Sequence, residues 1–272
     1  MAAPEKLYIY EIAGRINPPA VLTGEDFLGC WREGDCSYWF FTAKKQEPVS
    51  AWLKEEGRAG GYLSETEMNF ADWEAGQPLK PTRVGGFYLC PIWETPEAAP
   101  GEILIRLEPG LAFGSGYHPT TRLCLELLRR VYEEDTPEQV LDLGTGSGIL
   151  TLACLALGSR RVVAVEHNDL AVRTAQRNFR HNRMEQEIFL INGDARHFTY
   201  LQANLVLANI HLDVLLDLAA SSELFDKKWQ IYSGLLGTQV DRFLAVLKER
   251  PVEVLEVLDE NLWFAVLARR RE

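Results

Sequence analysis

The amino-acid sequence predicts an α/β fold, with a mostly parallel sheet covered by helices and a small α+β domain before it. Beyond Gly101, short apolar runs alternate regularly with amphipathic helical patterns, which is typical of a parallel sheet with helices on both faces. Before about Trp73 the pattern is instead short and aromatic, and this stretch is about half the usual length of a domain. We therefore expect two regions with different architectures.

The region after Gly101 contains the strands and helices of the main sheet. Strands are expected at 103–107, 139–143, 162–165, 188–191, 205–208, 230–232, 252–258 and 262–267. Amphipathic helices fit at 240–248 and at 169–182, the latter with Asn168 or Asp169 as its N-cap. Only Asp259-Glu260-Asn261 separates the last two strands, so we expect a hairpin and an antiparallel edge at this end of the sheet.

The N-terminal region predicts strands at 7–12 and 36–41 and a short helix at 49–56. Prolines then punctuate a connecting stretch, which also contains a predicted strand at 85–89. The expected division is a small α+β domain at 1–75, a linker with a connecting strand at 76–100 and the main α/β domain at 101–272.

The composition excludes several classes of protein. With 28 basic and 39 acidic side chains the net charge is −11, so the chain lacks the electrostatic footprint of a protein that binds nucleic acid directly. The five cysteines form no CxxC pair and His, Cys and carboxylate residues do not cluster, so we expect neither a disulfide framework nor a metal. We expect a soluble cytoplasmic protein, because no signal peptide pattern or membrane-spanning apolar run is present.

A glycine-rich turn is the strongest functional signal. The apolar strand 139–143 runs into Gly144, Gly146 and Gly148, and a helical pattern follows. Dinucleotide-binding loops place the third glycine three residues after the second, where this chain has Ile149, so a pyrophosphate loop is disfavoured.

Glu166 closes the next strand of the predicted sheet, at the same edge as the glycines. A carboxylate at this position accepts hydrogen bonds from both hydroxyls of a ribose. The glycines and Glu166 together predict a site for a nucleoside-type cofactor. The ordinary alternatives, a surface turn and a solvated charge, explain the pair less well.

Two later strands also end in polar residues at this edge. Asp194 follows the third strand and is expected near the adenine, although Asn-Gly-Asp is also an ordinary tight turn. Asn209 ends the fourth strand, where its amide can hold the amino acid end of a cofactor and orient an incoming amine. The alternative for Asn209 is a cap for the helix that begins near Leu212.

The block FGSGYHPTT, from Phe113 to Thr121, opens a helix just before the glycine turn. Together with 140–149 and 208–210, this block resembles the PrmA family, the bacterial methyltransferases of large-subunit ribosomal protein eleven. The resemblance covers roughly Trp73 to the end of the chain. It implies a class I methyltransferase fold with a Rossmann-like, mixed seven-stranded sheet behind a small N-terminal substrate-recognition domain.

The resemblance also implies the cofactor, S-adenosylmethionine, and the residues that contact it. The cofactor-binding residues expected from the family pattern and the glycine turn are Phe113, Thr121, Gly144, Gly146, Gly148, Glu166, Asp194 and Asn209. The chain departs from the family pattern where a different residue is usual, at Tyr117, Thr145, Glu166 and Asp169. Because the glycines and a carboxylate remain, the predicted site tolerates these departures.

The expected reaction is methyl transfer to lysine or α-amino nitrogens of a basic protein, the ribosomal protein named above. Asn209 is the expected catalytic residue, because its side-chain oxygen can accept the N–H groups of the amine, while Phe113 or Tyr117 flanks the sulfonium. His118 and His211 are near enough to act as proton acceptors, but a loop-fixing hydrogen bonder and a first-turn helix residue are the favoured interpretations.

Three other functions stay open from the sequence. A related methyltransferase with another protein or a small-molecule acceptor would have the same cofactor site. A module that binds the cofactor without catalysis would need the same fold, although the retained site residues disfavour it. A nicotinamide-dependent oxidoreductase is disfavoured by the glycine spacing.

Overall fold

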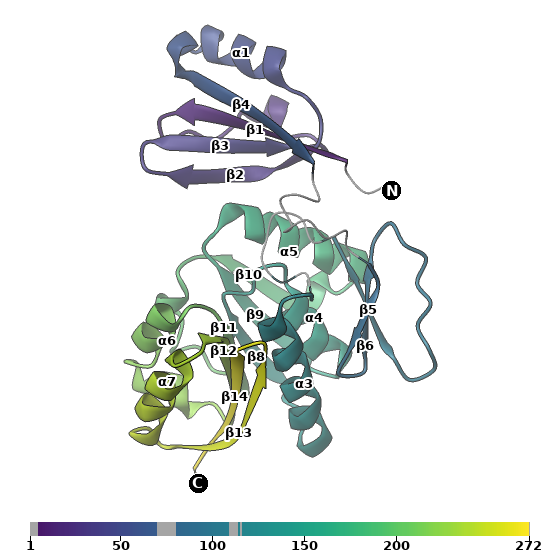
Figure 1. Ribbon diagram of the computed structural model, residues 1–272, viewed down its shortest axis with the longest axis vertical. Helices are drawn as coiled ribbons and strands as arrows, with labels where there is room; N and C mark the ends of the chain where they lie inside the picture. Colours follow the sequence, from purple (N-terminus) through teal and green to yellow (C-terminus); the bar gives the residue numbers. More distant parts are fainter. Residues whose placement is uncertain (1–4, 70–79, 109–113, 115, 272) are drawn as a thin grey trace.

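The computed structural model describes residues 5–69, 80–108, 114 and 116–271. A small N-terminal module lies over one end of a larger α/β domain (Figure 1). The predicted domain boundary at residue 75 lies outside the described residues, as does Phe113.

The N-terminal module is an antiparallel four-stranded sheet with the order β2-β3-β1-β4 and one helix on one face. Its elements are β1 (Lys6–Ala13), β2 (Phe27–Glu33), β3 (Cys36–Phe41), α1 (Gln46–Glu55) and β4 (Tyr62–Asn69). Trp39 and Phe41 are fully buried between the sheet and α1, so these aromatic residues are core residues. The predicted strands and helix are confirmed.

The sequence did not predict β2 and β4, and each has a local reason. A bulge at Gly29 breaks the alternation of β2, and β4 (YLSETEMN) is mostly polar because it is an edge strand.

The uncovered face of the module lies against helix α5 (Asp169–Asn182) of the larger domain. Leu170, in the first turn of α5, is buried against Leu7, Leu28 and Phe40. A Cβ on Gly29 would overlap the side chain of Leu170, so the glycine provides the notch that receives it.

A separate small sheet stands beside the main one. It contains β5 (Thr82–Val84), β6 (Phe87–Pro91) and β7 (Ile103–Leu107), with β6 and β7 parallel. The predicted strand at 103–107 therefore exists, but its expected place in the main sheet was wrong. The Asn182 side chain bonds both the N–H and the carbonyl of Arg106, at 2.9 and 2.7 Å, so α5 satisfies the free edge of β7.

The main sheet has seven strands in the order β10-β9-β8-β11-β12-β14-β13, and only β14 is antiparallel to the others. The strands are β8 (Gln139–Leu143), β9 (Arg161–Glu166), β10 (Ile188–Asn192), β11 (Leu205–Asn209), β12 (Trp229–Leu236), β13 (Val252–Glu260) and β14 (Trp263–Arg270). The strand order reverses between β8 and β11, where ligands bind in open sheets of this kind.

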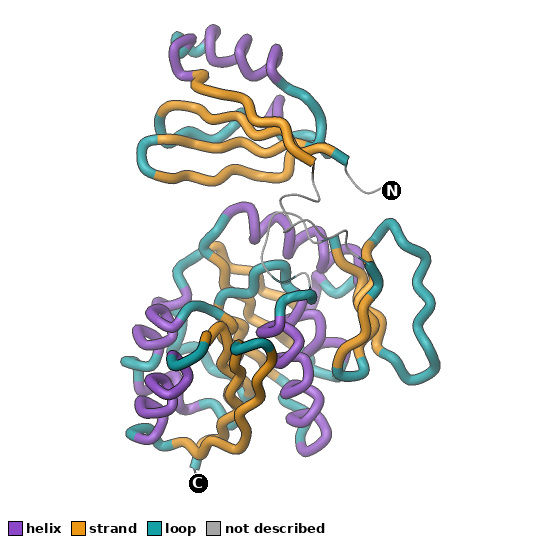
Figure 2. Tube along the Cα trace, in the orientation of Figure 1, coloured by secondary structure: helices purple, strands orange, loops and turns teal. Residues whose placement is uncertain are grey.

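Helices cover both faces of this sheet (Figure 2). One face packs against α5, α3 (Pro119–Glu134) and α4 (Ile149–Ala156), and the other against α6 (Leu212–Leu218) and α7 (Gln239–Lys248). The strands are nearly continuous apolar runs because both of their faces are buried. The predicted helices at 169–182 and 240–248 are confirmed, as is the C-terminal hairpin.

Candidate active site at the carboxyl edge of the sheet

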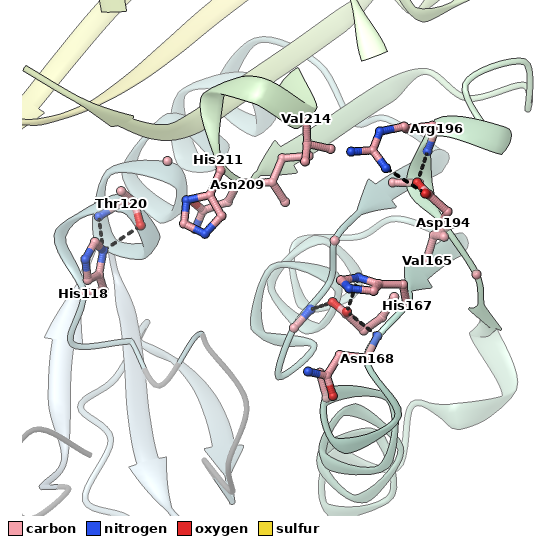
Figure 3. A pocket seen from close by; sticks show the side chains of 18 of the residues that line it. His118, Thr120, Val165, His167, Asn168, Asp194, Arg196, Asn209, His211 and Val214 are labelled. Carbon is pink, nitrogen blue, oxygen red and sulfur yellow. Dashed lines mark hydrogen bonds and ion pairs between the residues drawn. The ribbon is translucent and has the colours of Figure 1, made fainter. Parts of the chain in front are cut away.

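A cleft of about 510 Å³ opens at the carboxyl ends of β8, β9, β10 and β11. We call one side the glycine wall, formed by Gly144, Gly146, Val165, Glu166, His167, Asn168 and Asp194. We call the other side the Asn209 wall, formed by His118, Thr120, Asn209, Ile210, His211, Gly234 and Trp263. Figure 3 shows His118, Asn209 and His211 across the cavity from His167 and Asn168.

The glycine turn after β8 has left-handed backbone at Gly144, Gly146 and Gly148. Gly144 and Gly146 line the cleft, which is where the glycines of a ligand-binding loop are expected. Gly148 has another role: it is the N-cap of α4, and a Cβ there would overlap the ring of Phe179. The structure thus brings two of the three predicted glycines to the cavity.

Glu166 lies at the end of β9 and is buried beside the turn. Its carboxylate accepts hydrogen bonds from the main-chain N–H of Gly146 at 3.1 Å and of Asn168 at 2.9 Å. Each oxygen keeps a further lone pair for a ligand. The side chain predicted to bind a ribose therefore also fixes the glycine turn.

A second carboxylate, missed in the sequence, supports the turn from behind. Asp142 is buried in β8 and accepts hydrogen bonds from the hydroxyls of Thr145, at 2.6 Å, and Thr151, at 2.7 Å. Burial raises the pKa of Asp142 to about 6 although both hydroxyls oppose the rise, and the charge of Glu166 adds to it. An acidic residue inside an apolar strand, two positions before a glycine, was the available signal.

The start of α3 brings His118 and Thr120 into the Asn209 wall. His118 is the N-cap of α3, and its Nδ1 accepts a hydrogen bond from the Thr120 N–H. Burial lowers the pKa of the His118 imidazole, and the Arg122 charge lowers it further. The loop-fixing role predicted for His118 is confirmed.

Thr121, a predicted cofactor residue, is fully buried and does not line the cleft. Its hydroxyl has no hydrogen-bond partner among the described residues. Tyr117, the alternative to Phe113 beside a sulfonium, bonds instead through its hydroxyl to the main chain of Lys80.

Asn209 ends β11 and faces the cavity, as predicted. The alternative role as a helix cap is not seen, because His211 occupies the N-cap position of α6. His211 was predicted to lie in the first turn of this helix, and the structure places it one position earlier, at the N-cap. Ile210 follows, and its N–H donates to the Ser233 carbonyl at 3.1 Å.

Ile210 fits against glycines from both neighbouring strands. A Cβ on Gly144 would overlap the Ile210 side chain, and a Cβ on Gly234 would overlap its carbonyl. Gly234 sits at a bulge in β12 with a φ of 89°. It was missed in the sequence because only strand pairing places it at the cavity.

Asp194 lines the cleft but has local partners as well. It is the N-cap of a short 3-10 helix, where it accepts a hydrogen bond from the Arg196 N–H at 3.0 Å and pairs with the Arg196 guanidinium at 2.8 Å. These hydrogen bonds and the Arg196 charge lower the pKa of Asp194. Arg196 also pairs with Asp217 at 2.8 Å, so the only cation that lines the described cleft, apart from histidines, is neutralised twice.

Trp263 is another lining residue that the sequence did not indicate. It starts β14 and contacts the His118 ring edge-on, with ring centroids 4.6 Å apart. An ion pair between Arg122 and Glu260, with Nε and Oε2 3.0 Å apart, joins α3 to the end of the neighbouring strand β13. The hairpin end is therefore attached to the start of α3.

Two classes of feature are not found in the described part of the chain. Its His, Cys, Asp and Glu side chains form no group of three that could hold a metal ion. None of its helices combines the length and apolarity needed to cross a bilayer.

Known proteins similar to this chain share a name. Residues 35–271 match the family model "Ribosomal protein L11 methyltransferase (PrmA)". The chain is 33% identical to the ribosomal protein L11 methyltransferase of Heliobacterium modesticaldum over 233 residues, which cover 84% of this chain and 73% of that protein. It is 34% identical to the protein of the same name from Caldicellulosiruptor saccharolyticus over 217 residues, covering 77% and 70%.

A solved structure agrees with these sequence relatives. The crystal structure of ribosomal protein L11 methylase from Lactobacillus delbrueckii subsp. bulgaricus has a TM-score of 0.61 and 29% identity, and the match covers 69% of this chain and 96% of that one. The fold is thus the predicted class I, Rossmann-like methyltransferase fold. The chain belongs to the PrmA family of ribosomal protein L11 methyltransferases, and it is a protein methyltransferase.

Proposed function

We propose that this methyltransferase transfers methyl groups from S-adenosylmethionine to lysine or α-amino nitrogens of ribosomal protein L11. The observation that carries the proposal is one cleft that is lined by the glycine turn, Glu166 and Asn209 together. The names of the relatives support L11 as the acceptor. Because that acceptor is a ribosomal protein, we propose that the enzyme works in the cytoplasm.

The residues present fit this cofactor. The buried Thr121 hydroxyl has no hydrogen-bond partner among the described residues, and the adjacent Thr120 lines the cleft, so a hydrogen-bonding group is left unused beside the cavity. The charged lining residues Glu166, Asp194 and Arg196 sum to one negative charge, which suits a cationic sulfonium. When bound, the cofactor supplies an activated methyl group.

We assign the ribose hydroxyls to Glu166 and the amino acid end to the main chain of Gly144 and Gly146. Asp194 is assigned to the adenine region, and Thr121 and Phe113 stay proposed cofactor contacts from the sequence block 113–121. Gly148 supports the turn by packing against Phe179.

The Asn209 wall is the proposed site of the acceptor amine. A lysine amine must lose a proton before it attacks, which at pH 7 costs roughly 4 to 5 kcal/mol in water. Ile210, Val214 and Trp263 line the same cavity, and an apolar surrounding lowers the pKa of an amine. The Asn209 side-chain oxygen then accepts an N–H of the neutral amine and aligns its lone pair for in-line attack.

The N-terminal module at 1–75, followed by the linker at 76–100, is proposed to recognise the protein substrate, and 101–272 to carry the reaction. The packing supports this role because the sheet of the module lies against the first turn of α5, and the N-cap Asn168 and Ala171 of that helix line the cleft.

The test is a methylation assay with purified ribosomal protein L11 and labelled S-adenosylmethionine, read by mass spectrometry. The wild-type enzyme is expected to label L11, and Asn209→Ala is expected to lower kcat about 100-fold while S-adenosylmethionine still binds. The matched control is Asn192→Ala, which changes another asparagine at the end of a strand that does not line the cleft. Unlabelled L11 would refute the acceptor, and unchanged kcat in Asn209→Ala would remove that residue from the mechanism.

A further inference from the structure

Leucine 262 combines exposure with an unfavourable backbone conformation. It forms the tip of the β13–β14 hairpin with Asn261, and both residues have positive φ, 51° for Asn261 and 67° for Leu262. A two-residue turn of this kind favours Asn-Gly, so Asn261 suits its place and the leucine does not. The Leu262 side chain is nevertheless 70% exposed, and therefore burial does not compensate for the strain.

A second exposed leucine lies beside this turn. Leu236, at the end of β12, is directly opposite Trp263 in the antiparallel pairing, so the two side chains lie on the same face of the sheet. Leu236 is 43% exposed, and the carbonyl of Leu262 accepts a hydrogen bond from Gly237 at 2.8 Å. Leu236, Leu262 and Trp263 are thus neighbours, and we call them the apolar rim.

The apolar rim is continuous with the cleft. Trp263 lines the cavity and contacts His118, and Figure 1 shows the hairpin end beside the start of α3. The Arg122–Glu260 ion pair holds the hairpin in this place. Through Trp263 the rim therefore borders the cleft at the Asn209 wall.

From these observations we propose that the apolar rim binds an apolar side chain of the protein substrate next to the amine that is methylated. This inference rests on the proposed function and adds a specificity determinant to it. For a substrate segment that enters the cleft beside Trp263, burial of Leu262 and Leu236 against an apolar side chain would favour segments that carry one. The exposed carboxylate of Asp259, two residues before Asn261 in the same hairpin, suits a partner whose adjoining groups are cationic.

The deciding experiment uses variants that do not endanger the fold. Leu262→Gly relieves the strained turn, so the melting temperature is expected to stay equal or to rise by about 2 °C. The KM for ribosomal protein L11 is expected to rise about tenfold, because a leucine contact is lost, while the Kd for S-adenosylmethionine stays unchanged. Leu236→Ser is expected to raise the same KM without altering the turn.

Phe189→Thr is the matched control. Phe189 is 62% exposed on β10, at the opposite edge of the sheet, and does not line the cleft. Its KM for L11 should equal that of the wild type. A wild-type KM in both leucine variants would overturn the proposed role of the rim and leave the proposed function intact. A loss of self-association on gel filtration with an unchanged KM would also overturn it, since the rim would then bind a second copy of the chain. If the wild-type enzyme does not methylate L11 at all, the proposed function is refuted, and so is the proposal that the rim binds a side chain of L11.

Discussion

The two walls of the cleft are built in different ways. The glycine wall comes from short segments that directly follow β8, β9 and β10, and its polar contacts are made by main-chain N–H groups and buried carboxylates. The Asn209 wall draws on α3, β11, β12 and β14, which are up to 145 residues apart, from His118 to Trp263. Its residues are held by packing, as in the contact between His118 and Trp263.

We propose that this difference separates two tasks. A cofactor is the same molecule in every turnover, so preformed main-chain groups can bind it at little cost in ordering. An acceptor amine must be placed and desolvated by side chains from several elements, and their position depends on strand register. Changes in the two walls should therefore affect different measurements.

The largest effect is expected where the Asn209 wall is locked to the sheet. Gly234→Ala should lower the free energy of unfolding by about 4 kcal/mol, because the new Cβ would overlap the Ile210 carbonyl at a backbone φ of 89°. The melting temperature should then fall by about 10 °C in a thermal melt. Gly237→Ala is the control: φ is also positive there, but no atom lies within 4 Å, so only about 1 kcal/mol should be lost.

Behind the glycine wall, Asp142 should make stability depend on pH. Its folded pKa of about 6 lies above its usual value of 3.8, so the folded state keeps a proton that the unfolded chain releases. The free energy of unfolding should therefore fall by about 2 kcal/mol from this group as pH rises from 4 to 6. Denaturant titrations at several pH values should show Asp142→Asn gaining stability relative to the wild type across that window.

Asp135 should change the free energy of unfolding with pH in the opposite direction. Hydrogen bonds from Lys228 and Trp229 hold the pKa of Asp135 below its usual value. Its contribution is present above the unfolded pKa and is lost as pH falls below about 4. Equal curves for Asp142→Asn and the wild type would show that the Asp142 carboxyl does not titrate in this window.

For cofactor affinity, Glu166 should matter most. Glu166→Ala should raise the Kd for S-adenosylmethionine about 100-fold in calorimetry, because the two proposed ribose contacts and the hydrogen bond to the glycine turn would be lost together. Asp194→Ala should raise it only about fivefold, since that carboxylate is already bound by Arg196. Similar losses in both variants would contradict the assigned roles.

The smallest effect is expected at the seat of the N-terminal module. Leu170→Ala should cost about 2 kcal/mol, because Leu170 is buried against Leu28 and Phe40, and amides of β2 should exchange faster in hydrogen exchange. The Kd for S-adenosylmethionine should change less than twofold, since Leu170 does not line the cleft. Val21 is exposed in the same module, so Val21→Ala should change neither the free energy of unfolding nor this Kd.

Much of the glycine wall could be predicted from the sequence. Gly144, Gly146 and Glu166 directly follow apolar strands, and parallel strands bring their carboxyl ends to one edge whatever the loops do. Asn209 was found for the same reason. Gly148 was misjudged because the turn alone does not reveal whether a glycine serves a ligand or the packing of Phe179.

The order of strands and the surroundings of the cleft needed the structure. The strand at 103–107 has the pattern of a main-sheet strand, yet pairing with β6 and the amide of Asn182 assign it to another sheet. Thr121 lies in the expected block, but helix packing buries it and turns Thr120 to the cavity.

The sequence by itself determined the alternation of strands and helices, the family and the cofactor side of the site, because these depend on local periodicity and on residues close together in the chain. Only the tertiary structure decided which residues form the Asn209 wall. Trp263, Gly234 and Ile210 meet through strand register and a bulge, and register is set by long-range packing that no short stretch of sequence contains.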